Sequence, residues 1–537
     1  MEQFEPAEAS VSVGERLAPI APSIFGGLAE HFGTSVNDGM WDRVTGQARP
    51  DVKAALKAMG TRLIRYPGGC YSASYHWRDG VGPVEARPHH ERTMWTELGE
   101  QLGGMVLGDR PPNERLPDPT PQGLGKLMGP PEPNIVGTDE MLQFCTDIGA
   151  EAMFVANLGT GTPDEAADWV AYANRPASPG RVTWWGVGNE TYGSHEPGHS
   201  SPEEYGRKLA EFSRAMKAAD PTIQIIGVGL PVFPDDVGWK PDGVIVVYDA
   251  EQWNRAVLEA AAPDIDALSL HWYFPGMIGR SLSGVDDYVQ LVTSPDLFER
   301  AVAKTLETID QIVPHRRLAL SVDEWNRMVE LEDHFSTNHC LADAGFFAGV
   351  YTALLTHADR VRIGCISHLV NCLAPIQAPA PGQLFVTSAY LVAQLYSEHA
   401  RGWTRQIECA SSDVEVPMLA DVRGDVGPSA GVGARTASGL VAAATSDGSA
   451  EAVFLTSREL RRPTHVSLAG LPPSARSAQW RVLSGPDLFA ANTPEQPNTL
   501  YWSATTVELD NGRAEVTLPP GGTGALLIES ATAVGER

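Results

Sequence analysis

Eight short apolar runs separated by longer amphipathic stretches constrain the fold of this chain more than any other feature. The runs recur between residues 23 and 400. Such alternation is typical of a parallel sheet with crossover helices, and eight parallel strands can close into a barrel. We therefore predict an α/β fold of the (β/α)8, or TIM, barrel type, with strands at residues 24–29, 62–66, 152–157, 182–187, 223–228, 265–270, 318–322 and 361–367.

Two of the connecting segments carry helix start signals. Residues 162–165 (Thr-Pro-Asp-Glu) and 201–204 (Ser-Pro-Glu-Glu) each offer a hydroxyl at the N-cap, a proline at the first helical position and a glutamate at the third. These patterns predict helices that begin at the prolines. Residues 341–358 predict a long apolar helix that packs against the barrel.

With 537 residues, the chain is too long for one ordinary domain. We predict an N-terminal strand within residues 1–20, a catalytic barrel over residues 21–400 and a β-sandwich over residues 401–537. An insertion at residues 92–133 interrupts the barrel, and its second half holds eight prolines and three glycines. This composition disfavours regular helix or strand. The insertion is either a lid over the barrel mouth or a surface excursion that could make oligomer contacts.

The pattern changes after residue 400. Runs at residues 440–444, 451–456 and 464–468 are short and separated by turn residues, which predicts a C-terminal β-sandwich. Asp510-Asn511-Gly512, between runs at residues 507–509 and 514–518, is a hairpin signal. We expect a loop rich in glycine, serine and alanine near residues 424–438, and a strand at residues 7–13 that joins the sandwich.

Charge and composition limit the partners. The formal net charge of −27 disfavours nucleic acid, because phosphate backbones are repelled, and suits a neutral ligand such as a sugar. The first residues have neither the basic nor the apolar region of a signal peptide, and no run of about 18 apolar residues predicts a membrane span. Six cysteines without C-x-x-C spacing predict reduced thiols. We therefore expect a cytoplasmic protein without a membrane partner.

Two predicted strands, the fourth and the seventh, lead directly into glutamates. Residues 182–188 precede Asn189-Glu190, and residues 318–322 precede Asp323-Glu324. Glutamates at the carboxyl ends of barrel strands point into the active-site mouth, so these two should face each other. Glycoside hydrolysis needs one protonated carboxyl group and one ionised carboxylate across the scissile bond. The alternative is two strand-end glutamates held in salt bridges, which explains either residue alone better than both together.

Seven motifs extend this pattern along the chain: Ala29-Glu30-His31-Phe32-Gly33, Arg65-Tyr66-Pro67-Gly68-Gly69, Trp77-Arg78-Asp79-Gly80-Val81-Gly82-Pro83, Asn157-Leu158-Gly159-Thr160-Gly161, Gly188-Asn189-Glu190, Leu270-His271-Trp272-Tyr273 and Asp323-Glu324-Trp325-Asn326. Together they resemble family 51 of the glycoside hydrolases, the α-L-arabinofuranosidases. The resemblance covers nearly the whole chain, except residues 92–133 and 424–438.

The resemblance implies roles for five residues. Glu190 matches the general acid/base and Glu324 the nucleophile. Asn189 matches a residue that hydrogen-bonds the sugar 2-hydroxyl, and Glu30 matches a carboxylate that binds other hydroxyls of the furanose. Tyr273 matches a tyrosine whose hydroxyl steadies the nucleophile, although an ordinary half-buried aromatic is the alternative.

Two further residues match the polar floor of the site, and two depart from the family pattern. Arg65 and His271 match the floor; a buried network that only supports the barrel is the alternative for them and for Glu30. Cys70 stands where the family usually has asparagine, and His368 where it usually has glutamine. Both departures lie in the predicted sugar pocket, so they affect which sugar is bound. The segment after Asp323-Glu324-Trp325-Asn326 also lacks the aromatic residues common there.

Other motif matches carry no function. Residues 195–199 match H-E-x-x-H, but proline and glycine within the match oppose the helix that a zinc site needs. Residues 427–431 match G-x-S-x-G without the flanking strand and helix of a nucleophile elbow. The expected chemistry requires neither a metal nor an organic cofactor.

The function expected from these residues is retaining, exo-acting hydrolysis of terminal α-L-arabinofuranosyl residues. The same mechanism on another glycone, such as a galactofuranoside, a D-arabinofuranoside or an endo-glycanase substrate, remains open because of Cys70 and His368. A catalytically inactive sugar-binding protein is a third possibility, which the presence of both glutamates disfavours. Proteins of the resembled family are commonly hexamers, so we expect a homo-oligomer.

Overall fold

The structure is a computed structural model that describes residues 5–90, 132–194, 196–235, 248–274, 282, 284–329, 338–417 and 435–529. Most of the predicted insertion at residues 92–133, and most of the predicted loop at residues 424–438, lie outside these ranges. The described ends of both segments are strands, contrary to the prediction. β7 (Glu132–Pro133) pairs with β6 (His89–His90), and β18 (Arg435–Ser438) pairs with β17 (Asp413–Val416).

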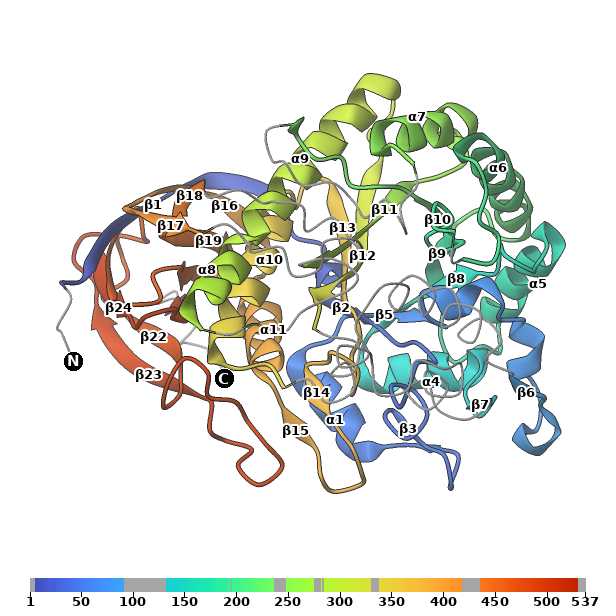
Figure 1. Cartoon of the computed structure of the whole chain (residues 1–537), viewed down its shortest axis with the longest axis horizontal. Coiled ribbons are helices and arrows are strands. Elements are labelled where there is room, and N and C mark those ends of the chain that lie inside the picture. Colours follow the sequence, from blue (N-terminus) through green and yellow to red (C-terminus); the bar gives the residue numbers. More distant parts are fainter. Residues whose placement is uncertain are drawn as a thin grey trace, which may run out of the picture.

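Eight parallel strands close into a barrel, which confirms the predicted fold class (Figure 1). All eight predicted strands are present: β2 (Gly26–Leu28), β5 (Leu63–Tyr66), β8 (Glu151–Ala156), β9 (Val182–Val187), β10 (Gln224–Val228), β11 (Ala267–Phe274), β12 (Ala319–Arg327) and β13 (Val361–Ile366). The strands β11 and β12 continue past their predicted ends at residues 270 and 322. This extension places His271, Tyr273 and Glu324 within strands.

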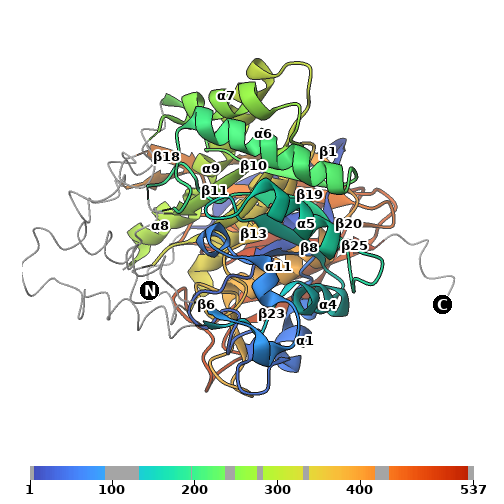
Figure 2. The same ribbon diagram turned by 90° about the vertical axis from the view of Figure 1, so that its right-hand side faces the viewer.

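Helices surround the barrel, and Figure 2 shows α4 to α7 along one side. The start signals at Thr162 and Ser201 are confirmed, because their hydroxyls accept hydrogen bonds from the backbone N–H groups of Glu165 and Glu204. The predicted helix at residues 341–358 is a 3-10 turn (Leu341–Asp343) followed by α10. The helices are α1 (Pro50–Met59), α4 (Thr138–Ile148), α5 (Pro163–Ala173), α6 (Pro202–Ala219), α7 (Ala250–Ala261), α8 (Val285–Thr293), α9 (Pro295–Ile312), α10 (Ala344–Thr356) and α11 (Ser388–His399).

The C-terminal domain is a nine-stranded sheet that curls around its own apolar core. One of its strands, β1 (Ala7–Pro19), comes from the N-terminal part of the chain and lies between β16 and β21. In hydrogen-bonded order the strands are β23 (Tyr501–Glu508), β22 (Ser477–Ser484), β25 (Thr523–Glu529), β20 (Ala450–Ser457), β19 (Leu440–Ser446), β16 (Trp403–Ser411), β1, β21 (Thr464–Ala469) and β24 (Ala514–Leu518).

One prediction for this domain is wrong. A tight turn does form between Asp510 and Arg513, but the two strands that flank it, β23 and β24, make no hairpin. They pair instead with β22 and β21, at opposite ends of the hydrogen-bonded order. The local turn signal specified the reversal of the chain but not the partners of the two strands that flank it.

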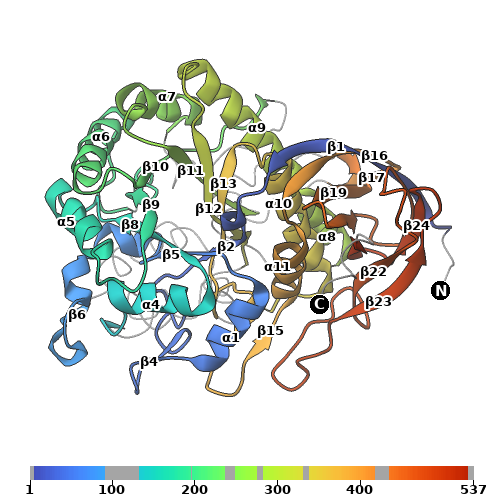
Figure 3. The same cartoon turned by 180° about the vertical axis from the view of Figure 1, so that it is seen from behind.

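The helices α10 and α11 lie between the barrel and the curled sheet, as Figures 1 and 3 show. The ring of Tyr396 on α11 stacks on Phe454 of β20 with ring centroids 4.2 Å apart. The barrel and the sheet therefore share one apolar core at this junction. No helix among the described residues is long and apolar enough to cross a membrane.

Candidate active site

The two glutamates at the ends of the fourth and seventh barrel strands lie face to face. Glu190 follows β9, and Glu324 is within β12. One carboxylate oxygen of each, together with a ring nitrogen of His271, lie within 4.8 Å of one another. Both side chains are buried, with Glu190 3% and Glu324 7% exposed. Two buried carboxyl groups whose oxygens lie this close together are unusual outside catalytic sites.

Unusual backbone conformation and closely approaching glycines mark the glutamates of the site. Glu190 has a φ of 38°, a region that non-glycine residues seldom occupy and that often marks functional positions. Directly after β5, the Pro67-Gly68-Gly69 sequence passes beside two glutamates. A Cβ atom on Gly69 would collide with Oε1 of Glu324, and one on Gly68 would lie 2.5 Å from Cγ of Glu30. Only glycine allows this approach.

Glu324 is held by a cation and a phenol. Arg65, itself 1% exposed, donates from Nη1 to Oε1 of Glu324 and from Nη2 to Oδ1 of Asn189 at 2.7 Å. The hydroxyl of Tyr273 donates to Oε2 of Glu324 at 2.7 Å and also contacts the hydroxyl of Ser367 at 2.9 Å. These contacts favour the ionised form of Glu324. Both of its oxygens accept hydrogen bonds, and the donor to Oε1 is the permanently charged guanidinium of Arg65.

Glu190 has different neighbours. The hydroxyl of Tyr192 donates to its Oε1 at 3.1 Å, and Nδ1 of His271 lies 2.8 Å from the same oxygen. Nδ1 of His271 also lies 3.6 Å from Oε2 of Glu324. Burial alone would lower the pKa of His271, but the carboxylates of Glu324 and Glu190 raise it to about 9. His271 is therefore a cation at neutral pH and links the two glutamates.

A second ion pair lies beside the first. Nε2 of His368 is 3.0 Å from Oε2 of Glu30, whose other oxygen accepts the backbone N–H of Tyr71 at 2.9 Å. The ring of His368 stacks on Phe32 with ring centroids 5.7 Å apart. Although burial lowers the pKa of His368, the sulfur of Cys372 and the carboxylate of Glu30 raise it to about 10. Burial raises the pKa of Glu30, yet the hydrogen bond and charge of His368 hold it below its usual value.

Asn189 connects the catalytic pair to a third carboxyl group. Its Nδ2 donates to Oε1 of Glu196 at 3.0 Å and lies 3.9 Å from Sγ of Cys70. Glu196 is 4% exposed. Burial, with the charges of Glu196 and Glu30, raises the pKa of the Cys70 thiol well above its usual value, so this thiol is neutral. No sequence pattern points to Glu196 as a site residue, because its segment is irregular and matches only the H-E-x-x-H pattern.

Two groups of described side chains are close enough to hold a cation: Cys70, Glu190 and Glu196, and Glu190, His271 and Glu324. Both fit a metal poorly at neutral pH. A metal ligand must be deprotonated, whereas the thiol of Cys70 is neutral and His271 is protonated. The residues 196–198 of the H-E-x-x-H match lie in bends and turns, not in a helix.

Comparison with known proteins shows the family of this chain. Residues 55–256 match the "Alpha-L-arabinofuranosidase 1 domain", and residues 323–521 match the "Alpha-L-arabinofuranosidase C-terminal domain". The chain is 30% identical to "Alpha-L-arabinofuranosidase C" of Emericella nidulans over 428 residues, 74% of this chain and 75% of that protein. The chain belongs to glycoside hydrolase family 51. The predicted family is thereby confirmed, and with it the class of enzyme, a glycoside hydrolase.

Other family 51 proteins agree over most of the chain. "Intracellular exo-alpha-(1->5)-L-arabinofuranosidase" of Acetivibrio thermocellus is 28% identical over 415 residues, covering 69% of this chain and 71% of that protein. The crystal structure of a "GH51 alpha-L-arabinofuranosidase" from Thermotoga petrophila superposes with a TM-score of 0.77 at 26% identity, covering 97% of this chain and all of that one.

The structure gathers every predicted site residue of this family 51 chain at the mouth of the barrel: Glu30, Arg65, Cys70, Asn189, Glu190, His271, Tyr273, Glu324 and His368. It also adds Tyr192, Glu196 and Asp323. Asp323 lies 3.2 Å from Nε of Arg65. Adjacent residues of a regular strand point to opposite faces, so its position next to Glu324 gave no signal. The pairing of β11 with β12 has a register shift at this point, and Asp323 and Glu324 both reach the site.

Proposed function

We propose that this family 51 protein is a retaining exo-glycosidase that releases terminal non-reducing α-L-arabinofuranosyl residues from arabinose-containing oligosaccharides. The observation that carries the mechanism is the spacing of Glu190 and Glu324, whose carboxylate oxygens come within 4.8 Å. Retaining glycosidases place their carboxyl groups about 5–5.5 Å apart, and inverting enzymes about 6.5–9.5 Å apart. The sugar is taken from the names of the relatives, several of which are called exo-α-(1→5)-L-arabinofuranosidases.

In the first step, the carboxylate of Glu324 attacks the anomeric carbon of the bound furanoside. The bond from that carbon to the leaving oxygen breaks, and Glu190 donates its proton to the oxygen. Arg65 and Tyr273 fix the attacking carboxylate through their hydrogen bonds to its two oxygens. The products are a free aglycone alcohol and a glycosyl ester on Glu324.

In the second step, a water molecule attacks the same carbon while Glu190, now ionised, accepts a proton from it. The ester bond breaks, the carboxylate of Glu324 is restored, and arabinose leaves with the anomeric configuration of the substrate. Asn189 is held by Arg65 and Glu196 so that its amide can face the sugar 2-hydroxyl. Glu30 would bind further hydroxyls.

The pocket contains a feature that favours a second candidate, a related furanosidase with another sugar preference. His368 is a cation bound to Glu30, so it offers hydrogen-bond donors and no acceptor, whereas a glutamine offers both. Cys70 offers only a weak donor beside Asn189. A site that hydrogen-bonds a particular hydroxyl discriminates strongly, because unmatched buried polar groups are costly.

We therefore expect the double variant Cys70→Asn with His368→Gln to raise L-arabinofuranosidase activity relative to activity on galactofuranoside and D-arabinofuranoside. Each of the two exchanged polar contacts is expected to change the ratio of the kcat/KM values by about 10-fold. The measurement is a panel of nitrophenyl glycosides assayed with the unmodified protein and the variant.

The two single variants serve as controls, since they separate the contribution of each position. If the unmodified protein already cleaves nitrophenyl α-L-arabinofuranoside best, and the double change only lowers that rate, the second candidate is wrong and the arabinofuranosidase assignment stands.

We further infer a homo-oligomer in the cytoplasm. The location is supported by relatives whose names include "Intracellular", and assembly by the barrel and the sheet, which could offer large faces to bury. Light scattering at micromolar concentration is expected to give a mass several times that of one 57.6 kDa chain. A mass of a single chain would contradict the inference.

A further inference from the structure

A third buried carboxyl group stands beside the catalytic pair. One carboxylate oxygen of Glu196, one of Glu190 and Sγ of Cys70 lie within 4.8 Å of one another. Glu196 comes from the segment that follows Glu190, and its Oε1 accepts the amide of Asn189 at 3.0 Å. Two carboxyl groups this close in a buried site oppose each other's ionisation, so a proton on one of them is stabilised.

The charges of the site indicate that a proton is present. Four carboxyl groups face two cations: Glu190, Glu196, Asp323, Glu324, Arg65 and His271. The guanidinium of Arg65 is engaged by Glu324 and Asp323, and His271 lies between Glu190, Glu324 and Asp323. With every carboxyl group ionised, two negative charges would remain in a buried cluster, which is costly. The neutral thiol of Cys70 offsets neither of them.

The hydrogen bonds of Asn189 determine which form of Glu196 is favoured. The amide N–H of Asn189 donates to Glu196 and so favours the ionised form of that group. Asn189 is fixed on its other side, where its Oδ1 accepts from Arg65, so the amide cannot turn to offer an acceptor instead. The hydrogen bond of Tyr192 and the charge of His271 favour the ionised form of Glu190, whereas the charge of an ionised Glu196 favours its protonated form, which the proposed function requires.

We propose that Glu196 is a positioning residue whose negative charge stabilises the proton on Glu190 before that proton is donated to the leaving oxygen. Its hydrogen bond also holds the amide of Asn189 toward the sugar. This role rests on the proposed function, in which Glu190 is the general acid. It extends that function by assigning the protonation of the acid to a specific charged neighbour. Glu196 hydrogen-bonds Asn189 and has an oxygen within 4.8 Å of one of Glu190, but it does not act on the reacting atoms itself.

The test is the pH dependence of kcat/KM for Glu196→Gln, measured on an arabinofuranosyl oligosaccharide whose leaving group needs protonation. The substitution removes the charge and retains a carbonyl oxygen that can accept from Asn189. Without the nearby negative charge Glu190 should lose its proton more easily, so the alkaline limb should move to lower pH by about one unit or more. The loss of activity should be much smaller on the acid side than on the alkaline side.

Two variants complete the experiment. Glu203→Gln removes a nearby exposed carboxylate at the start of α6 and should leave the limb in place. Glu196→Asp keeps the charge, so its limb should stay near that of the unmodified protein even if the shorter side chain lowers the rate.

An unmoved limb in Glu196→Gln, an equal loss at every pH, or a limb in Glu196→Asp displaced as far as in the glutamine variant would overturn the proposal. Failure of the underlying function has another signature. If Glu190→Ala hydrolyses the oligosaccharide normally, Glu190 is not the acid, whatever Glu196 does.

Discussion

Replacing Glu324 by alanine is expected to lower kcat on every substrate, whatever its leaving group, by on the order of 10⁴-fold or more. Without this carboxylate no covalent intermediate can form, and the hydrogen bonds from Arg65 and Tyr273 lose their acceptor. The measurement is the hydrolysis of nitrophenyl α-L-arabinofuranoside and of an arabinofuranosyl oligosaccharide under identical conditions. The two substrates should be affected to the same degree.

The matched control is Glu307→Ala, which removes an exposed carboxylate on α9 and should leave kcat unchanged. Azide gives a sharper readout. A small anion can enter the space left by Glu324 and attack an activated aryl glycoside directly, which yields a glycosyl azide of inverted configuration. A Glu324→Ala protein that retains substantial activity without azide would contradict the assignment of the nucleophile.

Replacing Glu190 by alanine should have an effect that depends on the leaving group. General acid catalysis contributes roughly 10²–10⁴-fold, and this contribution should be lost on an oligosaccharide. An aryl leaving group with a low pKa needs little proton donation, so the first step on such a substrate should change far less. The second step still lacks its base, and the glycosyl-enzyme should therefore accumulate, visible as a burst of nitrophenol.

Glu203→Gln is again the control, because it removes a nearby carboxylate that lies outside the site. In Glu190→Ala, azide should attack the accumulated intermediate and give a glycosyl azide of retained configuration, the opposite of the Glu324→Ala product. Equal losses on the oligosaccharide and the aryl glycoside, with no burst, would argue against Glu190 as the acid/base.

Strand positions were predictable because each barrel strand is buried on both faces and so reads as a short apolar run. Counting these runs was enough to place Glu190 and Glu324 on the fourth and seventh strands. The extension of β11 to Phe274 and of β12 to Arg327 was not visible in this way. Polar residues interrupt the apolar pattern there, since the strand ends carry the site.

The partners within the site were less predictable. Sequence similarity pointed to His368 and Glu30 separately, but only the fold brings their atoms to 3.0 Å across 338 residues. Glu196 lacks even a sequence signal, because an irregular segment has no periodicity from which the direction of a side chain can be inferred. Similarly, β23 pairs with β22 and β24 with β21, partners that a local turn signal at residues 510–512 does not encode.

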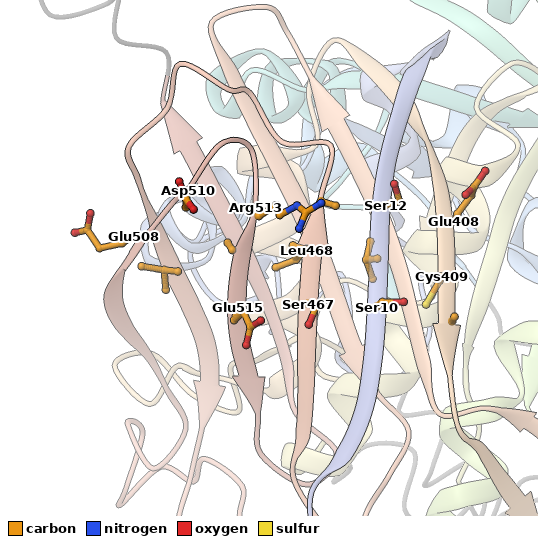
Figure 4. A pocket seen from close by; sticks show the side chains of 15 residues that line it. Ser10, Ser12, Glu408, Cys409, Ser467, Leu468, Glu508, Asp510, Arg513 and Glu515 are labelled. Carbon is orange, nitrogen blue, oxygen red and sulfur yellow. The ribbon is translucent and has the colours of Figure 1, made fainter.

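The curled sheet has a pocket lined by residues of β1, β16, β21, β23 and β24, but its character differs from that of the barrel mouth (Figure 4). Ser10, Ser12, Ser467 and Glu408 are among its lining residues, and no aromatic ring that could stack on a sugar is among them. The barrel mouth, and not this pocket, therefore has the chemistry of a glycosidase.

The place of β1 in the middle of the C-terminal sheet has a consequence for how the chain comes together during synthesis. Ala9 leaves the ribosome long before its neighbours in the sheet, Ser411 and Val466. The whole barrel must therefore emerge before this strand finds its partners. In a fragment that begins after residue 400, β16 and β21 would both lack β1 as their partner. Exposed strand edges of this kind promote aggregation. Residues 7–19 are therefore an integral part of the C-terminal sheet, and we expect neither half of the chain to fold stably without the other.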